Sequence, residues 1–180
     1  MRSTREHPDQ AEGHRVPGHW EGDLLVGKEG KSAVITLVDR QSRFTMILAL
    51  PQGKSADHVA DVLIDHVQGL PALVRKSLTW DQGTEMGRHA AVATDLPVFF
   101  VDPHSPWQRP TNENTNHMIR EYLPKGTDIV QHQPYPTAIA EELNTRPRAC
   151  LGFYTPQEVF HRMLLGDGTG DDSESVASTN

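Results

Sequence analysis

Residues 19–50 read HWEGDLLVGKEGKSAVITLVDRQSRFTMILAL and contain three apolar runs separated by turn-forming residues. The runs cover residues 19–27, 32–39 and 44–50, and they are rich in the aliphatic and β-branched residues that favour strands. Glycines at 27 and 30 and the polar segment Asp39-Arg40-Gln41-Ser42 separate them. This part of the chain therefore predicts three consecutive strands joined by short turns.

The residues that follow alternate between helical and extended patterns. Two further strands are predicted at 77–80 and 98–101, and helices at 55–70, 84–93, 111–123, 137–145 and 155–165. Three adjacent strands followed by alternation favour an α/β fold. We expect a mixed sheet of about five strands with helices on both faces.

The composition indicates one folded domain with polar ends. The chain has 180 residues, of which 36% are hydrophobic, enough for a single core. Residues 1–16 and 166–180 lack apolar periodicity, which predicts a flexible N-terminal segment and a disordered acidic tail around a core at 17–165. No apolar run approaches the roughly 18 residues of a membrane span, and the polar start of the chain is not a secretory signal. The single cysteine, Cys150, excludes an internal disulfide and fits a reducing cytoplasm.

The charge balance is acidic, with 17 Lys and Arg against 24 Asp and Glu and a net charge of −7. Residues 166–180 hold four of the acids and no base, so the core is closer to neutral. A net negative charge does not exclude a polyanionic substrate. It predicts weak binding that is sensitive to salt, because few phosphates can be neutralised.

Three carboxylates stand out by their place in the predicted elements. Asp23 interrupts the first apolar strand, Asp81 directly follows the strand at 77–80, and Glu113 lies early in the helix at 111–123. Carboxylates at strand ends of such a sheet face the crevice where ligands bind, and oxygen-only ligands suit Mg²⁺ or Mn²⁺. With 24 acids in the chain, the alternative for each is a solvated surface charge.

Four separated segments, in this order, closely resemble the insertion-sequence-thirty family of bacterial transposases. They are HWEGDLLVGK (19–28), LTWDQGTEM (78–86), DPHSPWQRPTNENTNHMIREYLPKGTD (102–128) and LNTRPRACLGFYTPQEVF (143–160). The resemblance covers about residues 16–163. It implies an RNase H-like fold with an Asp-Asp-Glu active site, as in the wider group of transposases and retroviral integrases.

The resemblance also implies an activity and its residues. Asp23, Asp81 and Glu113 would be both the catalytic residues and the ligands of two Mg²⁺ or Mn²⁺ ions. The chain would be the catalytic core of a DNA transposase, which cleaves DNA phosphodiesters and transfers strands during transposition of an insertion sequence. Its partners would be DNA, as element ends and target, and further copies of itself on DNA, with no membrane. The expected location is the bacterial cytoplasm, at the nucleoid when bound to DNA.

Five residues near the third carboxylate are predicted to contact DNA: Arg120, Asn112, Asn116, Trp107 and Lys125. Arg120 lies seven residues after Glu113, so the two share a helix face two turns apart. The asparagines bracket Glu113, and an aromatic ring such as that of Trp107 can stack on an unpaired base. The alternatives are a surface ion pair for Arg120, helix-start hydrogen bonding for the asparagines and core packing for Trp107.

Departures from the family keep a second function open. Pro110 and His117 stand where most members have glycine, and the 31 residues between Asp81 and Glu113 are about two fewer than usual. The helix-turn-helix region of the family does not occur in this sequence, so we expect no specific recognition of element ends. The alternative hypothesis is an inactive or truncated transposase remnant that only binds DNA or transposase subunits.

Overall fold

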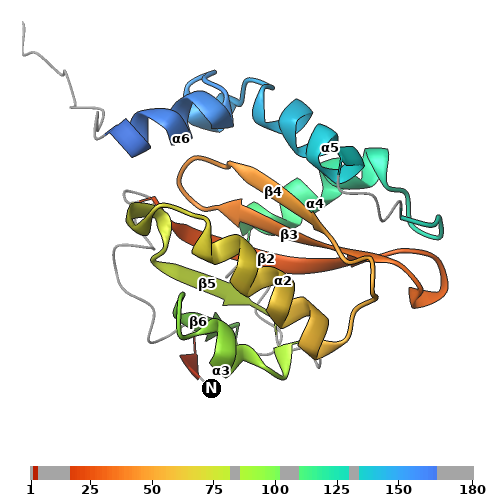
Figure 1. Cartoon of the computed structure of the whole chain (residues 1–180). Coiled ribbons are helices and arrows are strands. Elements are labelled where there is room, and N and C mark those ends of the chain that lie inside the picture. The colour runs from red at the N-terminus through yellow and green to blue at the C-terminus, as the bar shows by residue number, and fades with distance from the viewer. Residues whose placement is uncertain (1, 4–16, 82–85, 102–109, 130–133, 166–180) are drawn as a thin grey trace, which may run out of the picture.

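A mixed six-stranded sheet in the order β1-β6-β5-β2-β3-β4 forms the centre of the computed structural model (Figure 1). The structure describes residues 2–3, 17–81, 86–101, 110–129 and 134–165. The strands are β1 (Arg2–Ser3), β2 (His19–Val26), β3 (Ala33–Asp39), β4 (Thr45–Ala49), β5 (Ser77–Trp80) and β6 (Val98–Phe100). β3 pairs antiparallel with β2 and β4, whereas β5 runs parallel to β2 and β6. The predicted mixed sheet is confirmed, because each of the five predicted strands overlaps one of β2 to β6.

β1 is a strand that the sequence did not predict. Its two residues pair in parallel with β6 and belong to the segment 1–16, for which we expected a flexible chain. A strand of two residues has no alternation of apolar and polar positions, so no pattern could indicate it. The remainder of that segment and the acidic tail at 166–180 lie outside the described residues.

The helices cover both faces of the sheet, as predicted (Figure 1). They are α2 (Ala56–Gln68), α3 (His89–Val92), α4 (Pro110–Tyr122), α5 (Pro134–Asn144) and α6 (Pro156–Leu165), with short 3-10 turns η2 (Lys28–Gly30), η3 (Ala72–Val74) and η6 (Ala149–Leu151). Local sequence sets their starts. Ser55 accepts the His58 N–H at the start of α2, and Thr155 and Glu158 form a reciprocal capping box at α6. None of the described helices has the length and apolar character needed to cross a bilayer.

Alternation along the strands assigns side chains to one of two cores. In β3, Ile35 packs in the core under α2, and its neighbour Val34 packs in the core under α4 and α5. In β2, Leu25 belongs to the α4 side. Asp23 lies two residues before Leu25 in the same strand, so it faces α4 as well.

The turn between β3 and β4 is organised by one buried carboxylate. Asp39 is 0% exposed and accepts hydrogen bonds from the N–H groups of Gly18 and Ser42 and from the Ser42 hydroxyl, at 2.7–2.8 Å. Burial raises the pKa of Asp39, and the hydrogen bonds from Ser42 and Gly18 oppose that shift. This turn fixes the backbone positions of Arg40 and Arg43, which extend toward α4.

Candidate active site

Asp23 is the most constrained of the three predicted catalytic carboxylates. It is half-buried on β2, and its Oδ2 accepts a hydrogen bond of 2.7 Å from the Asn116 amide on α4. The Asn116 carbonyl oxygen accepts a hydrogen bond of 3.1 Å from the Thr36 hydroxyl on β3, where Thr36 lies opposite Asp23 in the sheet register. Both ends of the Asn116 amide are therefore engaged. In this structure Asn116 orients Asp23, a role that the sequence analysis did not assign to it.

Asp81 directly follows β5, the parallel neighbour of the strand that carries Asp23. It is exposed, and β5 pairs with β2 so that Thr79 lies opposite Glu21. Continuing that register by two residues sets Asp81 next to Asp23. The alternation of side chains also gives Asp81 the same face as Thr79, opposite to the core residues Leu78 and Trp80. Two of the three predicted residues thus come from neighbouring parallel strands on the α4 side of the sheet.

Glu113 comes to the same region on a helix. It is exposed in the first turn of α4, which contacts β2 and β3. The adjacent residue, Asn112, is tied to β2 by a hydrogen bond from its backbone N–H to Glu21 Oε2, at 2.7 Å. The fold therefore brings Glu113 over the strand that carries Asp23.

The described residues do not form a closed metal centre. Among them, no three His, Cys, Asp or Glu side chains lie close enough together to hold a metal ion. The donor chemistry nevertheless fits a hard divalent cation, because Asp23, Asp81 and Glu113 offer only carboxylate oxygens. The neighbouring segments 82–85 and 102–109 lie outside the described residues.

Arg120 shares the α4 face of Glu113, as its spacing predicted, but it is occupied within the protein. Its guanidinium donates to the backbone carbonyls of Val26, at the end of β2, and of Leu123, each at 3.2 Å. Burial lowers the pKa of Arg120, and the negative charge of Asp23 opposes that shift. Here the guanidinium ties the end of β2 to the end of α4, and it is not paired with Glu121 as the alternative had it.

The other predicted DNA contacts have different outcomes. Asn112 is only 1% exposed, so its side chain is not presented to a nucleic acid in this structure, and its backbone N–H, not its side chain, makes the hydrogen bond at the start of α4. Its buried amide has no hydrogen-bond partner among the described residues. Lys125 is exposed in the loop after α4, where a DNA contact stays a prediction. Trp107 lies outside the described residues.

Glu21 is a site residue that the sequence analysis missed. Its side chain is 0% exposed, lies 3.1 Å from Arg40 Nε through Oε1, and accepts the Asn112 N–H through Oε2. That N–H is one of the first four of α4, which have no partner within the helix. A carboxylate at this end also interacts favourably with the helix dipole. The signal was available in the sequence, since Glu21 and Asp23 are two residues apart in a strand and must share a face.

Comparison with known proteins places this arrangement in a family. Residues 13–106 match the integrase core domain. The transposase for insertion sequence element IS1086 of Cupriavidus metallidurans is 46% identical over 167 residues, which are 91% of this chain and 49% of that protein. Transposase InsI for element IS30C of Escherichia coli is 50% identical over 151 residues, which are 82% of this chain and 39% of that protein.

A relative with lower sequence identity is matched over a similar share of both chains. The transposase for element IS4351 of Bacteroides fragilis is 35% identical over 162 residues, 88% of this chain and 49% of that protein. The chain thus spans about half, or less, of the length of these relatives. The resemblance drawn from the four sequence segments is confirmed, because similarity to insertion-sequence transposases extends over most of the chain. The match to more than half of its residues shows that the chain belongs to the integrase core domain family.

Proposed function

We propose that this chain is the catalytic core of a DNA transposase, which cleaves DNA phosphodiesters and transfers strands with the help of divalent metal ions. One observation carries the proposal. Asp23 lies on β2, Asp81 directly follows β5, the parallel neighbour of β2, and Glu113 lies on α4, which contacts β2, in a chain of the integrase core domain family. The relatives named above are transposases of insertion sequences, which makes DNA the expected substrate.

Asp23, Asp81 and Glu113 are the residues that would hold the metal, and Mg²⁺ or Mn²⁺ in two sites suits their oxygen-only chemistry. When bound, such ions activate a water or a DNA hydroxyl and stabilise the leaving oxygen of the phosphodiester. No covalent link between protein and DNA is required.

The surrounding residues would position this triad. Asn116 holds one carboxylate oxygen of Asp23, and Thr36 holds Asn116 in turn. Glu21 holds the first turn of α4 and therefore the backbone next to Glu113. Arg120 closes the other end of the contact between α4 and β2, and its positive charge offsets part of the negative charge of Asp23. Such supporting contacts are the usual means by which metal ligands keep their orientation.

A second candidate is a non-catalytic remnant that binds DNA or transposase subunits. The absence of an assembled group of three carboxylates among the described residues favours it. The catalytic proposal carries more weight, because a decayed copy has no need to keep the contacts that orient Asp23 and anchor α4.

Nicking of short DNA duplexes tests the proposal. We expect the chain to nick DNA in the presence of Mg²⁺ or Mn²⁺ and not in EDTA. Asp81→Asn should lower the rate at least about 1000-fold, equivalent to roughly 4 kcal/mol of barrier. Asp65→Asn is the matched control, since Asp65 is exposed on α2, on the other face of the sheet. Equal rates for the wild type and Asp81→Asn would favour the remnant.

A further inference from the structure

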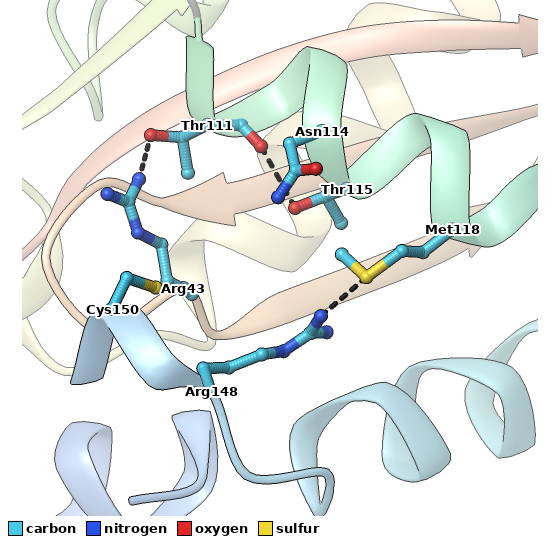
Figure 2. A pocket seen from close by; sticks show the side chains of 7 residues that line it. All are labelled: Arg43, Thr111, Asn114, Thr115, Met118, Arg148 and Cys150. Atoms are coloured by element: carbon cyan, nitrogen blue, oxygen red, sulfur yellow. Dashed lines mark hydrogen bonds between the residues drawn. The ribbon is translucent and has the colours of Figure 1, made fainter. Parts of the chain in front are cut away.

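A cavity of about 180 Å³ lies beside α4 (Figure 2). Four of its lining residues come from one side of α4: Thr111, Asn114, Thr115 and Met118. Arg43 reaches it from the turn between β3 and β4, and Arg148 and Cys150 reach it from the segment around η6. At 100° per residue, Glu113 points about 100° or more away from each of the four lining positions on the helix. The cavity therefore belongs to a different flank of α4.

Two guanidinium groups border this cavity without an acidic partner. None of its lining residues is acidic, and no described carboxylate lies within ion-pair distance of Arg43 or Arg148. Arg43 donates to the Thr111 hydroxyl, and Arg148 donates to the Met118 sulfur (Figure 2). Arg148 also donates to the Leu143 carbonyl, at 3.4 Å. Among the described residues, the buried Nε of Arg148 has no hydrogen-bond partner. Guanidinium groups bind oxyanions best, with parallel N–H donors, so these two lack the partner that suits their chemistry.

The local field also favours an anion. Burial and, after it, the positive charge of Arg146 lower the pKa of Arg148. Arg146 is itself paired with Glu142 at 3.2 Å, and Glu142 does not line the cavity. A negative group in the cavity would oppose both causes of the shift.

The backbone conformation of Arg43 also supports an anion site. Its φ is 63°, in the left-handed region that glycine favours and that side chains other than Asn and Asp rarely adopt. The Asp39 carbonyl holds this residue by accepting its N–H at 2.9 Å. The turn thus carries a long cationic side chain where glycine is better suited, and that side chain extends into the cavity (Figure 2).

We propose that this cavity binds a phosphate group of the DNA backbone through Arg43 and Arg148, with Asn114 as a further donor. The proposal rests on the proposed function for DNA as the partner. Because the cavity and Glu113 lie on different flanks of α4, the bound phosphate is not the one that is cleaved. The contact positions DNA along the β3–β4 side of the molecule and carries no sequence information. It also gives a net acidic chain a local site for a polyanion.

DNA affinity without catalysis is the first test. Fluorescence anisotropy of a labelled duplex in EDTA is measured at several salt concentrations for the wild type, Arg43→Gly and Arg148→Gln. We expect both variants to bind about tenfold more weakly, with a salt slope reduced by about one. Arg88→Gln is the matched control, because Arg88 pairs with Asp57 and Asp61 of α2, on the other face of the sheet. It removes the same charge and should leave the affinity unchanged.

Arg43→Gly keeps this test decisive if Arg148→Gln folds poorly. Glycine suits the left-handed backbone at position 43, so the melting temperature should be unchanged or higher. A folded Arg43→Gly protein that binds DNA as well as the wild type would overturn the proposal.

Cys150 supplies an independent readout, since it is the single cysteine of the chain, is exposed and lines the cavity. At a duplex concentration equal to the dissociation constant of the wild type, we expect alkylation of Cys150 by iodoacetamide to be slowed clearly in the wild type and only slightly in Arg43→Gly. In a second experiment, 1 mM inorganic phosphate replaces the duplex, and the alkylation rate of Cys150 is measured again. An unchanged alkylation rate with duplex would overturn the proposal, and protection by phosphate alone would identify a site for free oxyanions. The outcome is separable from the proposed function, because loss of metal-dependent nicking with intact protection by DNA would contradict only the catalytic proposal.

Discussion

At the scale of single residues, the orientation of Asp23 depends on its neighbour Asn116. The Asn116 amide donates to Asp23 at 2.7 Å and accepts from Thr36 at 3.1 Å, so the carboxylate is held from α4 and β3 together. The spacing of the sequence drew attention to Asn116 because it lies close to Glu113. Its actual partner, 93 residues away in the chain, could not be deduced before the helix was placed on the sheet.

Removing that neighbour should weaken the site without unfolding the protein. We expect Asn116→Ala to lower the nicking rate about 10- to 100-fold, as is usual when a residue that supports a metal ligand is lost. Glu121→Gln is the control, since Glu121 is exposed on the same helix. The nicking rates of both variants and the dependence of these rates on Mn²⁺ are measured together. A rate for Asn116→Ala equal to that of the wild type would show that Asn116 does not support the site.

A second prediction at this scale concerns pH. Burial lowers the pKa of His66 on α2, and the negative charge of Asp65 opposes that shift. The unfolded chain therefore binds a proton at a higher pH than the folded chain, so His66 costs stability as the pH falls below about 6.5. We expect the loss in free energy of unfolding between pH 7.5 and 5.5, measured with urea, to be smaller in His66→Gln. An exposed control, His161→Gln on α6, should lose as much as the wild type.

At the scale of elements, α4 is held at its first turn by a buried pair. Glu21 is 0% exposed and Arg40 is 15% exposed, and together they lie beneath Asn112. A carboxylate in the strand below thus anchors the helix that carries Glu113.

We expect Glu21→Ala to lower the free energy of unfolding by about 3 kcal/mol, because it removes the buried negative charge beside Arg40 and leaves the Asn112 N–H without its acceptor. Chemical denaturation measures this. Glu29→Ala removes the partner of Lys31 in an exposed pair and should change stability by less than about 0.5 kcal/mol. Equal effects of the two substitutions would show that Glu21 does not anchor the helix.

Elements whose apolar residues recur with a clear period could be predicted from the sequence, and elements without such a period could not. β2 to β4 alternate or run apolar over several residues, and α2, α4 and α6 lie within two residues of their predicted bounds. α5 begins three residues before its predicted start, because its first residues include two prolines that hid the period. β1 is too short to show a pattern, and α3 covers only four residues of the helix predicted at 84–93. For the site, the sequence placed Asp23, Asp81 and Glu113 on the right elements, whereas Glu21 and the cavity of Arg43 and Arg148 depend on contacts between distant segments.

At the scale of the whole molecule, net charge opposes DNA binding. The chain carries a net charge of −7, so affinity depends on a few local groups such as those in the cavity of Figure 2. We expect a dissociation constant for random duplex in the micromolar range or higher at physiological salt. The affinity should fall steeply between 50 and 200 mM salt. Anisotropy titrations at those two concentrations measure it. Nanomolar binding that does not change with salt concentration would contradict this expectation.

Thermal unfolding with and without Mn²⁺ shows whether Asp23, Asp81 and Glu113 form one metal site. Three carboxylates without a cation repel, and an ion that binds only the folded site stabilises it by mass action, by about 2.7 kcal/mol at 100 times its dissociation constant. For a domain of this size that corresponds to a rise in melting temperature of roughly 5–10 °C. We expect this rise in the wild type and in Asp65→Asn, and no rise in Asp81→Asn. An equal response of the wild type and Asp81→Asn to Mn²⁺ would contradict a single metal site formed by these residues.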